Sequence, residues 1–418
     1  MRISDAMISA NYMKNLNKSR EKITRLEEMI STEKKILAPS DDPSGTAKVI
    51  NMQTKLTNAS IYQENIDSSL SVISEALSSM ELMTDTTSDI LTLLTDAEDS
   101  TLSSSELESI ADQIDEMLSS LLDYANQEYD GKYLFGGTST STAPFAYSSD
   151  GLSVVTQTDI TGTQYARITE GILQQINIPG SEIFSTIITQ SGNLNSTSAV
   201  GTASTSTTSV YDADGTEYTL NVTYTKTAAN TYSMTYDVLD SDSNSILTSA
   251  PAAQTFVFDS STGKLKSVDG STPDEISISI DGTSIEFNLD ATTLKETSST
   301  STISCSANQE TNIFNTLISI RDTLANGDNI TDAQKEAVQS FYDNLVNKTS
   351  ELGNIENQIN NIDTLLTERV TNLTEQMSNI TDADLTELYV DLETQNTILE
   401  MTYEMAAMVL PKSLLDYL

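Results

Sequence analysis

Apolar residues recur every seven positions near both ends of the chain, and this repeat limits the possible folds more than any other feature of the sequence. The first series comprises Ile66, Ile73, Met80, Thr87 and Leu94, with Leu70, Leu77 and Leu91 at a companion offset. The second comprises Ile359, Leu366, Leu373 and Ile380, beside Ile355, Ile362, Val370 and Met377. Two apolar positions in every seven are typical of long helices that pack along one another. The sequence therefore predicts coiled-coil-like helices at both ends.

Glycine separates these ends from the middle of the chain. Of 16 glycines, 13 lie between Gly131 and Gly282. A glycine inside a helix destabilises that helix by about 1 kcal/mol relative to alanine. The scarcity of glycine therefore favours helices at the two ends, and its abundance favours turns in the middle. Five segments of the middle alternate polar with β-branched or aromatic residues and predict strands: 218–226, 231–239, 254–259, 276–282 and 284–290.

These patterns predict a multidomain α plus β protein, in which the N- and C-terminal segments form one discontinuous coiled-coil-like rod of long helices with β-rich outer domains inserted. The expected divisions are terminal helical arms at 1–38 and 382–418, a helical rod domain at 39–130 and 308–381, a β-rich domain at 131–190 and an inserted β domain at 191–307. Two runs rich in Ser and Thr, 191–209 and 297–307, predict flexible linkers at the edges of the inserted domain.

The stretch 38-APSDDPSGTAKVI-50 could hold a metal or a catalytic acid pair, or it could separate two helices. Pro39 is expected to end a helix over residues 4–35, and Pro43 suits the first position of the next helix. Asp42 would cap the free N–H groups of that helix, and Asp41 would favour its positive end. A metal site would need more oxygen ligands. We therefore interpret Pro39, Asp42 and Pro43 as helix punctuation.

The two terminal segments carry opposite charge. Residues 1–35 hold eight Lys and Arg against five acidic residues, whereas residues 382–418 hold eight acidic residues against Lys412. Complementary charge along two helices favours their pairing and helps to set its register. Two solvated faces with no mutual role are the alternative.

Composition excludes several classes of function. The formal charge of the chain, 21 − 61 = −40, would repel nucleic acid and anionic membranes. Cys305 is the only cysteine, so no intrachain disulfide forms. We expect no secretory signal peptide, because the first residues lack an apolar core, and no membrane insertion, because no run of 18 apolar residues occurs.

Enzymatic chemistry is not expected, and neither is a cofactor or a metal. The chain has no histidine and no phosphate-binding loop, and its acidic residues lie on polar helix faces such as 107–118. A carboxylate-dependent hydrolase would require two buried acids in one pocket. Gly136 and Gly137 follow an aromatic segment but open no helix.

Four segments resemble bacterial flagellar axial proteins of the flagellin family: 2–50, 128-EYDGKYLFGGT-138, 175-QINIPGSEIF-184 and 380–418. The ending SLLDYL resembles the hook–filament junction class of that family rather than the filament subunits. Residues 210–238 and 256–265 look like an outer β domain of the flagellar hook protein.

This resemblance implies a structural subunit that joins hook to filament outside the cell. It implies export, unfolded, through the flagellar type III apparatus without a cleaved signal peptide. The implied partners are further copies of the chain in a ring, another hook-associated protein, flagellin, and an export chaperone at the C-terminal arm. Such arms are disordered in the monomer and pair on assembly.

The residues that we expect at the assembly interface of the arms are Ile3, Met7, Leu16, Ile23, Leu26, Ile30, Leu385, Leu392, Leu399, Leu414, Leu415 and Leu418. A flagellin-like filament subunit and a surface adhesin that uses the β region remain alternative functions.

Overall fold

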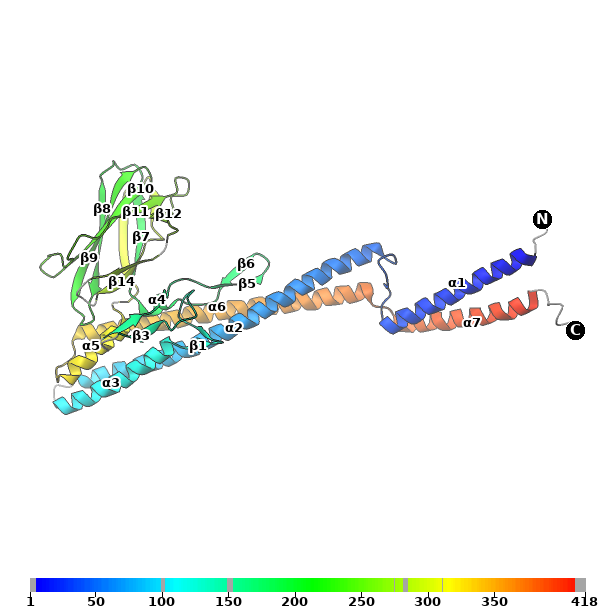
Figure 1. Cartoon of the computed structure of the whole chain (residues 1–418), viewed down its shortest axis with the longest axis horizontal. Helices are drawn as coiled ribbons and strands as arrows, with labels where there is room; N and C mark the ends of the chain where they lie inside the picture. Colours follow the sequence, from blue (N-terminus) through cyan, green and yellow to red (C-terminus); the bar gives the residue numbers. More distant parts are fainter. Residues whose placement is uncertain are drawn as a thin grey trace. The chain divides into compact units, whose positions relative to one another are not determined.

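A computed structural model describes residues 5–98, 102–148, 153–273, 275–280, 285–309 and 311–409. Its helices are α1 (Asp5–Thr32), α2 (Pro43–Ala97), α3 (Ser104–Ala125), α4 (Gly180–Phe184), α5 (Ile313–Ala325), α6 (Asp332–Thr381) and α7 (Leu385–Val409). Long helices from both ends of the chain flank a β-rich middle (Figure 1), so the expected α plus β fold is confirmed.

The chain divides into two compact units. The first contains residues 1–64 and 361–418, and the second contains residues 65–360, so that α2 and α6 contribute to both. This division falls inside α2 and α6 rather than at residues 38 and 382, where the sequence placed the ends of the arms.

In the first unit, α1 lies beside α7. Residues 43–64 of α2 lie beside the last part of α6 in Figure 1. The side-chain amide of Gln63 donates a hydrogen bond of 3.2 Å to the hydroxyl of Thr367, which joins α2 to α6.

In the second unit, one stripe of α2 is fully buried. The predicted series Ile66, Ile73, Met80, Thr87 and Leu94 has 0% exposure. The predicted companion series is wrong, because Leu70, Leu77 and Leu91 are only half-buried. The second buried series is instead Ser69, Ala76, Met83, Ile90 and Ala97. This series was not predicted, because Ser69, Ala76 and Ala97 have small side chains and the prediction relied on large apolar residues.

Helix α3 packs beside α5. A capping box starts α3, since the Ser103 backbone N–H donates to the Glu106 carboxylate at 2.7 Å. Arg321 of α5 forms ion pairs with Asp115 of α3 at 2.8 Å and with its neighbour Asp322 at 2.7 Å.

Three two-stranded hairpins and α4 precede the larger sheets. They are β1 (Glu128–Tyr129) with β2 (Lys132–Tyr133), β3 (Phe145–Tyr147) with β4 (Val154–Thr156), and β5 (Tyr165–Thr169) with β6 (Ile172–Gln175). Five buried phenylalanines hold this segment on the helices: Phe135, Phe145, Phe184, Phe314 of α5 and Phe341 of α6. The ring centroids of Phe145 and Phe184 are 4.9 Å apart, edge to face.

Two five-stranded sheets form the outer β unit. The first has the order β12-β11-β10-β9-β8 and is antiparallel throughout. Its strands are β8 (Ala203–Tyr211), β9 (Glu217–Ala228), β10 (Thr231–Leu239), β11 (Gln254–Phe258) and β12 (Leu265–Val268). The second is built around β7 (Ile187–Asn195), with β13 (Ile276–Ser279), β14 (Glu286–Asp290), β15 (Lys295–Thr297) and β16 (Thr302–Ala307).

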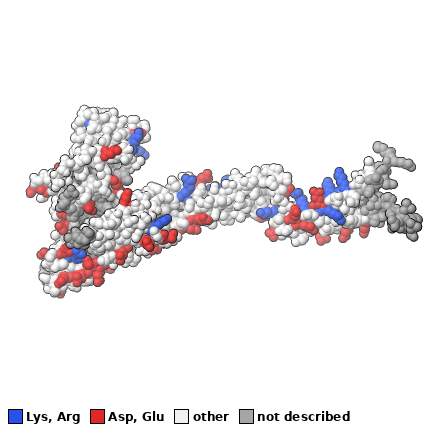
Figure 2. Space-filling view, in the orientation of Figure 1, with Lys and Arg blue, Asp and Glu red and all other residues white. Residues whose placement is uncertain are grey.

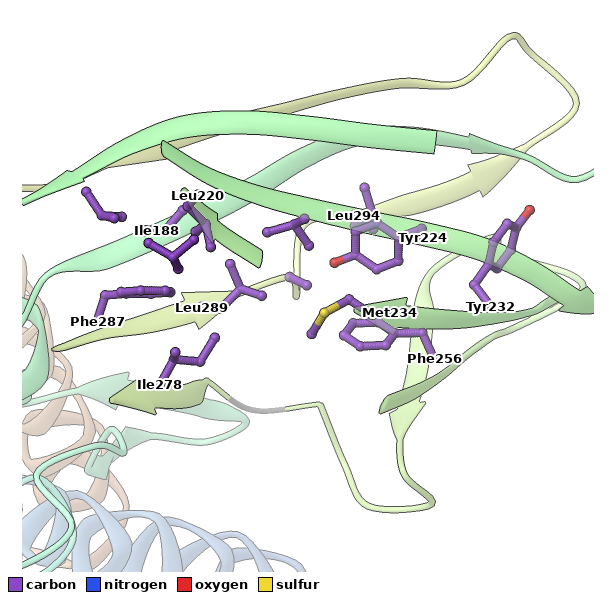
Figure 3. Close-up of a cluster of buried hydrophobic side chains, with 14 of the residues drawn as sticks. Ile188, Leu220, Tyr224, Tyr232, Met234, Phe256, Ile278, Phe287, Leu289 and Leu294 are labelled. Atoms are coloured by element: carbon purple, nitrogen blue, oxygen red, sulfur yellow. The ribbon is translucent and has the colours of Figure 1, made fainter. Parts of the chain in front are cut away.

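The core of the outer β unit lies between these sheets. Figure 3 shows Tyr224, Met234 and Phe256 of one sheet facing Leu289 and its neighbours of the other. The first and last strands of the unit, β7 and β16, are antiparallel neighbours, with Ile188 opposite Ala307 and Gln190 opposite Cys305.

The Ser- and Thr-rich runs are not flexible linkers. Residues 191–209 contain most of β7 and β8, and residues 297–307 contain β16. Most hydroxyl side chains of β8 and β16 are exposed or half-buried, and some of them pair across the strands, as Thr205 does with Thr223 at 2.9 Å. Every second side chain can therefore be polar while the strand keeps a buried face. The expected boundary between residues 190 and 191 also falls inside β7.

Candidate assembly site: the paired terminal arms

The two breaks between the arms and the longer helices meet in space. Helix α1 ends at Thr32, and Glu33 takes a positive φ of 57°. The Glu33 carbonyl accepts a hydrogen bond of 2.9 Å from Ala383 N–H, and Thr381 O accepts one of 2.8 Å from Lys35 N–H. The Lys35 ammonium also donates to the carbonyl of Asn379 at 2.8 Å.

Pro39 therefore does not end the first helix, as the sequence suggested. The helix ends at Thr32, three residues before the predicted end at residue 35, and the backbone then turns to pair with the segment after α6. We name residues 33–35 and 381–383 together the break pair.

The two adjacent aspartates have different roles. Asp42 Oδ1 accepts a hydrogen bond of 2.9 Å from Gly45 N–H, and α2 begins at Pro43, which is the geometry of an N-cap. Asp41 instead closes the turn before it, because its Oδ2 accepts bonds from the N–H groups of Leu37 and Ala38, both at 3.0 Å. The expectation that Asp41 serves the end of α2 is wrong.

Asp41 also ties this turn to α1. Its Oδ1 lies 2.6 Å from Nη2 of Arg25. The hydrogen bond from Arg25, together with those from the backbone N–H groups of Ala38 and Leu37, holds the pKa of Asp41 below its ordinary value. Sequence reasoning missed this pair, since nothing in the spacing of residues 25 and 41 points to a contact.

The arms contact each other through one side of each helix. Leu16 of α1 and Leu388 of α7 are buried, with 9% and 7% exposure. The guanidinium of Arg20 donates to the hydroxyl of Tyr403 at 2.6 Å and 3.1 Å, and its carbon lies 5.9 Å from the centre of that ring.

The structure places the expected interface residues in three groups. Leu16, Ile23, Leu26, Ile30, Leu392 and Leu399 are buried or half-buried. Met7 and Leu385 are exposed, at 59% and 37%. Ile3, Leu414, Leu415 and Leu418 lie outside the described residues. Leu388 and the Arg20–Tyr403 contact were missed, although Leu388 lies three residues after Leu385 and four before Leu392, on the spacing of one helix face.

Charge is distributed unequally over the arms. In Figure 2, Lys and Arg gather along α1, with a few acidic residues among them, and acidic side chains line α7. Among the residues that the structure describes, no ion pair joins α1 to α7. At the break pair, the positive charges of Lys34 and Lys35 act on the Asp382 carboxylate.

A hollow of about 920 Å³ is lined by residues of α2 and of the β1–β2 and β5–β6 hairpins. Asp67 and Asp130 both line it, beside Tyr129, Lys132 and Arg167. Both carboxylates are exposed to solvent. They therefore lack the buried environment that a carboxylate pair needs for acid–base catalysis.

The described part of the outer β unit contains a buried ion pair between Lys226 and Glu296. The Lys226 ammonium lies 3.7 Å from Glu296 Oε1, with side-chain exposures of 4% and 2%, and also donates to the carbonyl of Ser196. Tyr232 donates to Glu296 at 3.0 Å and packs its ring against Lys226. Burial, with the bond to Glu296, raises the pKa of Tyr232 well above its ordinary value.

Cys305 takes part in a second polar group of this unit. Its thiol contacts the hydroxyl of Ser206 at 3.1 Å and the amide of Gln190 at 3.3 Å. Burial raises the pKa of the Cys305 thiol, which keeps it in its less reactive, protonated form.

Within the described ranges, no three His, Cys, Asp or Glu side chains gather as a metal site would require. No helix there is long and apolar enough to cross a membrane.

Comparison with known proteins gives two curated relatives. Flagellar hook-associated protein 3 of Escherichia coli (strain K12) is 27% identical over 147 residues, covering 35% of this chain and 46% of that protein. The same protein of Salmonella typhimurium is 25% identical over 159 residues, covering 36% and 48%. The chain spans about half the length of the curated relatives it matches.

Among solved structures, hook-associated protein 3 of Legionella pneumophila is 17% identical, with a TM-score of 0.47, covering 79% of this chain and 98% of that one.

Three family models match the chain. The bacterial flagellin N-terminal helical region matches residues 3–140, and the bacterial flagellin C-terminal helical region matches residues 336–418. The D2 domain of the flagellar basal body protein FlaE matches residues 177–343, which contain the outer β unit. The two flagellin models together match more than half of the chain, including all of α1, α2, α3 and α7 and nearly all of α6. The chain belongs to the flagellin family.

Proposed function

We propose that the chain is a structural subunit of the bacterial flagellum that joins the hook to the filament. The observation that carries this proposal is the match of both flagellin models to the helices whose arms pair at the break pair and along α1 and α7. The curated relatives, both named flagellar hook-associated protein 3, support the junction rather than the filament itself.

The proposed partners follow from this position. Copies of the chain assemble with one another through their arms. The assembled copies contact another hook-associated protein on one side and flagellin on the other. An export chaperone holds the C-terminal arm before secretion, and the subunit reaches the extracellular flagellum. No catalytic step is part of the proposed function.

Deletion of the gene tests the proposal. The mutant should be non-motile, with completed hooks, and should release flagellin into the medium instead of polymerising it. Expression of the full chain should restore filaments. Filaments of normal length in the deletion strain would contradict the proposal.

A filament subunit is the second candidate, because the helices match models of flagellin itself. The number of copies per flagellum separates the two functions. A junction subunit is present in few copies at the base of each filament, whereas a filament subunit is present along its whole length. Gold-labelled antibody on isolated flagella gives this distribution directly.

A further inference from the structure

Helix α1 has a basic face directed away from α7. Lys14, Lys18 and Lys22 are all exposed and follow one another at intervals of four residues. A step of four residues advances about 6 Å along a helix and returns to nearly the same face. These lysines therefore form one stripe, distinct from the side of α1 that carries the buried Leu16 and the half-buried Ile23. We call it the lysine stripe.

Helix α7 has an acidic and apolar face directed away from α1. Glu393, Glu400 and Glu404 are exposed, and Glu400 and Glu404 have the same four-residue interval as the lysines. Val390 and Met401 lie near them, at 62% and 58% exposure. A shallow groove on this face is lined by Tyr389, Val390, Glu393, Thr394 and Thr397. We call this the glutamate face.

The two faces cannot meet within one subunit, because the α1–α7 contact uses the opposite side of each helix. Among the described residues, no ion pair involves the lysine stripe or these three glutamates. Two lysine stripes would repel each other, and so would two glutamate faces. A lysine stripe of one copy against a glutamate face of another brings three positive charges onto three negative ones.

We infer that neighbouring copies of the chain pack head to tail, with the lysine stripe of α1 on the glutamate face of α7 of the next copy. This inference rests on the proposed function and names the contact by which the arms assemble. Such a contact joins two different surfaces, so it repeats from copy to copy until a ring closes. The apolar residues beside the glutamates become buried in it, and the charges fix its register.

Charge reversal in the full chain tests the contact, with expression in the deletion strain and with secretion measured alongside motility. Lys14→Glu, Lys18→Glu and Lys22→Glu together should reduce motility to the level of the deletion strain, and Glu393→Lys, Glu400→Lys and Glu404→Lys should do the same. A chain carrying all six changes should regain motility, because the opposite charges have only been exchanged.

The matched control is Lys264→Glu, Lys266→Glu and Lys295→Glu, which changes the charge equally at three exposed lysines of the outer β unit and should leave motility intact. If the six-fold variant is secreted normally but does not assemble, the inference is wrong. If the lysine-stripe variant assembles like the wild type, the inference is also wrong, while the junction function stands. The deletion phenotype alone decides that function.

Cross-linking separates contacts between copies from contacts within one chain. In a Cys305→Ser background, Lys18→Cys and Glu404→Cys in assembled flagella should give a ladder of covalent oligomers after treatment with a short bismaleimide. A product that migrates only as a monomer, or no cross-link at all, would overturn the inference.

Discussion

The backbone N–H of Ala383 donates a hydrogen bond to the carbonyl oxygen of Glu33, across 2.9 Å, and so joins two helix breaks from opposite ends of the chain. The reciprocal bond from Lys35 to Thr381 makes this contact a short antiparallel bridge. An arm cannot move away from its long helix at one break without disturbing the other. The two arms are therefore expected to order together.

The break pair should weaken in acid. The hydroxyls of Ser378 and Thr381, and the charges of Lys34 and Lys35, hold the pKa of Asp382 below its ordinary value. A carboxyl group whose pKa falls on folding stabilises the folded state above its unfolded pKa of about 3.9, and this stabilisation is lost as the pH falls through the folded value. Thermal unfolding followed by circular dichroism at 222 nm, which reports helix content, measures this loss at several pH values between about pH 6 and pH 3. Asp382→Asn should flatten the pH dependence; an unchanged dependence would exclude Asp382 as its source.

Asp42→Ala should destabilise the start of α2 by about 1 kcal/mol, the usual cost of losing an N-cap. The N–H of Gly45 then has no side-chain acceptor. Asp42→Ser, which can still accept this bond, is the matched control and should be nearly neutral. Thermal unfolding compares the two variants, and equal losses would show that the cap is not the cause. Calcium binding that Asp42→Ala abolished would reverse our interpretation of this turn.

Met83→Ala should cost more than Leu77→Ala. Met83 has 0% exposure, so its truncation leaves a cavity and should lower the free energy of unfolding by about 2–5 kcal/mol. Leu77 is half-buried, so its truncation should lower the free energy of unfolding less. Melting temperatures of the two variants provide the comparison. A larger loss for Leu77→Ala would restore the companion series that the sequence suggested.

Lys226→Met should strongly destabilise the outer β unit. It leaves the Glu296 carboxylate buried without its cation, and losing one partner of a buried pair costs about 3–5 kcal/mol. Lys226→Met combined with Glu296→Gln should recover much of the loss, because the uncompensated charge is gone while Tyr232 keeps an acceptor. Calorimetry of the full chain measures the transition of this unit, and a double variant no better than the single one would refute the explanation.

Leu399→Asp should leave the main melting transition of the monomer nearly unchanged while preventing assembly. Leu399 is only half-buried on α7, and a helix with little tertiary packing is marginal in water. Leu366→Asp, at a position with 6% exposure, should lower the melting temperature clearly. Similar losses in both variants would mean that the arms belong to the stable core.

Much of the fold followed from periodicity. The segments 218–226 and 231–239 were predicted as strands because they alternate strongly, and they lie in β9 and β10. The heptad series from Ile66 to Leu94 could be predicted because large apolar side chains occupy most of its positions, and the structure confirms that it is buried. In contrast, β8 and β16 were missed because their outward residues are Ser and Thr, which are equally typical of linkers.

The candidate site was less accessible to sequence reasoning. The apolar stripe from Leu16 to Ile30 marks one face of a helix, and the structure places that face against α7. The break pair could not be predicted, because its bonds are between backbone atoms of Glu33 and Ala383 and depend on where both chains bend. The Arg25–Asp41 pair likewise depends on the path of the turn between them.

The pairing of β7 with β16 places the entrance and the exit of the outer β unit side by side, with Ile188 opposite Ala307. A segment whose ends are adjacent behaves as a cassette, because the flanking helices need only a short hairpin in its place. We expect that evolution could acquire, exchange or discard this cassette without changing the helices, and that foreign domains with adjacent termini could be displayed at the same position.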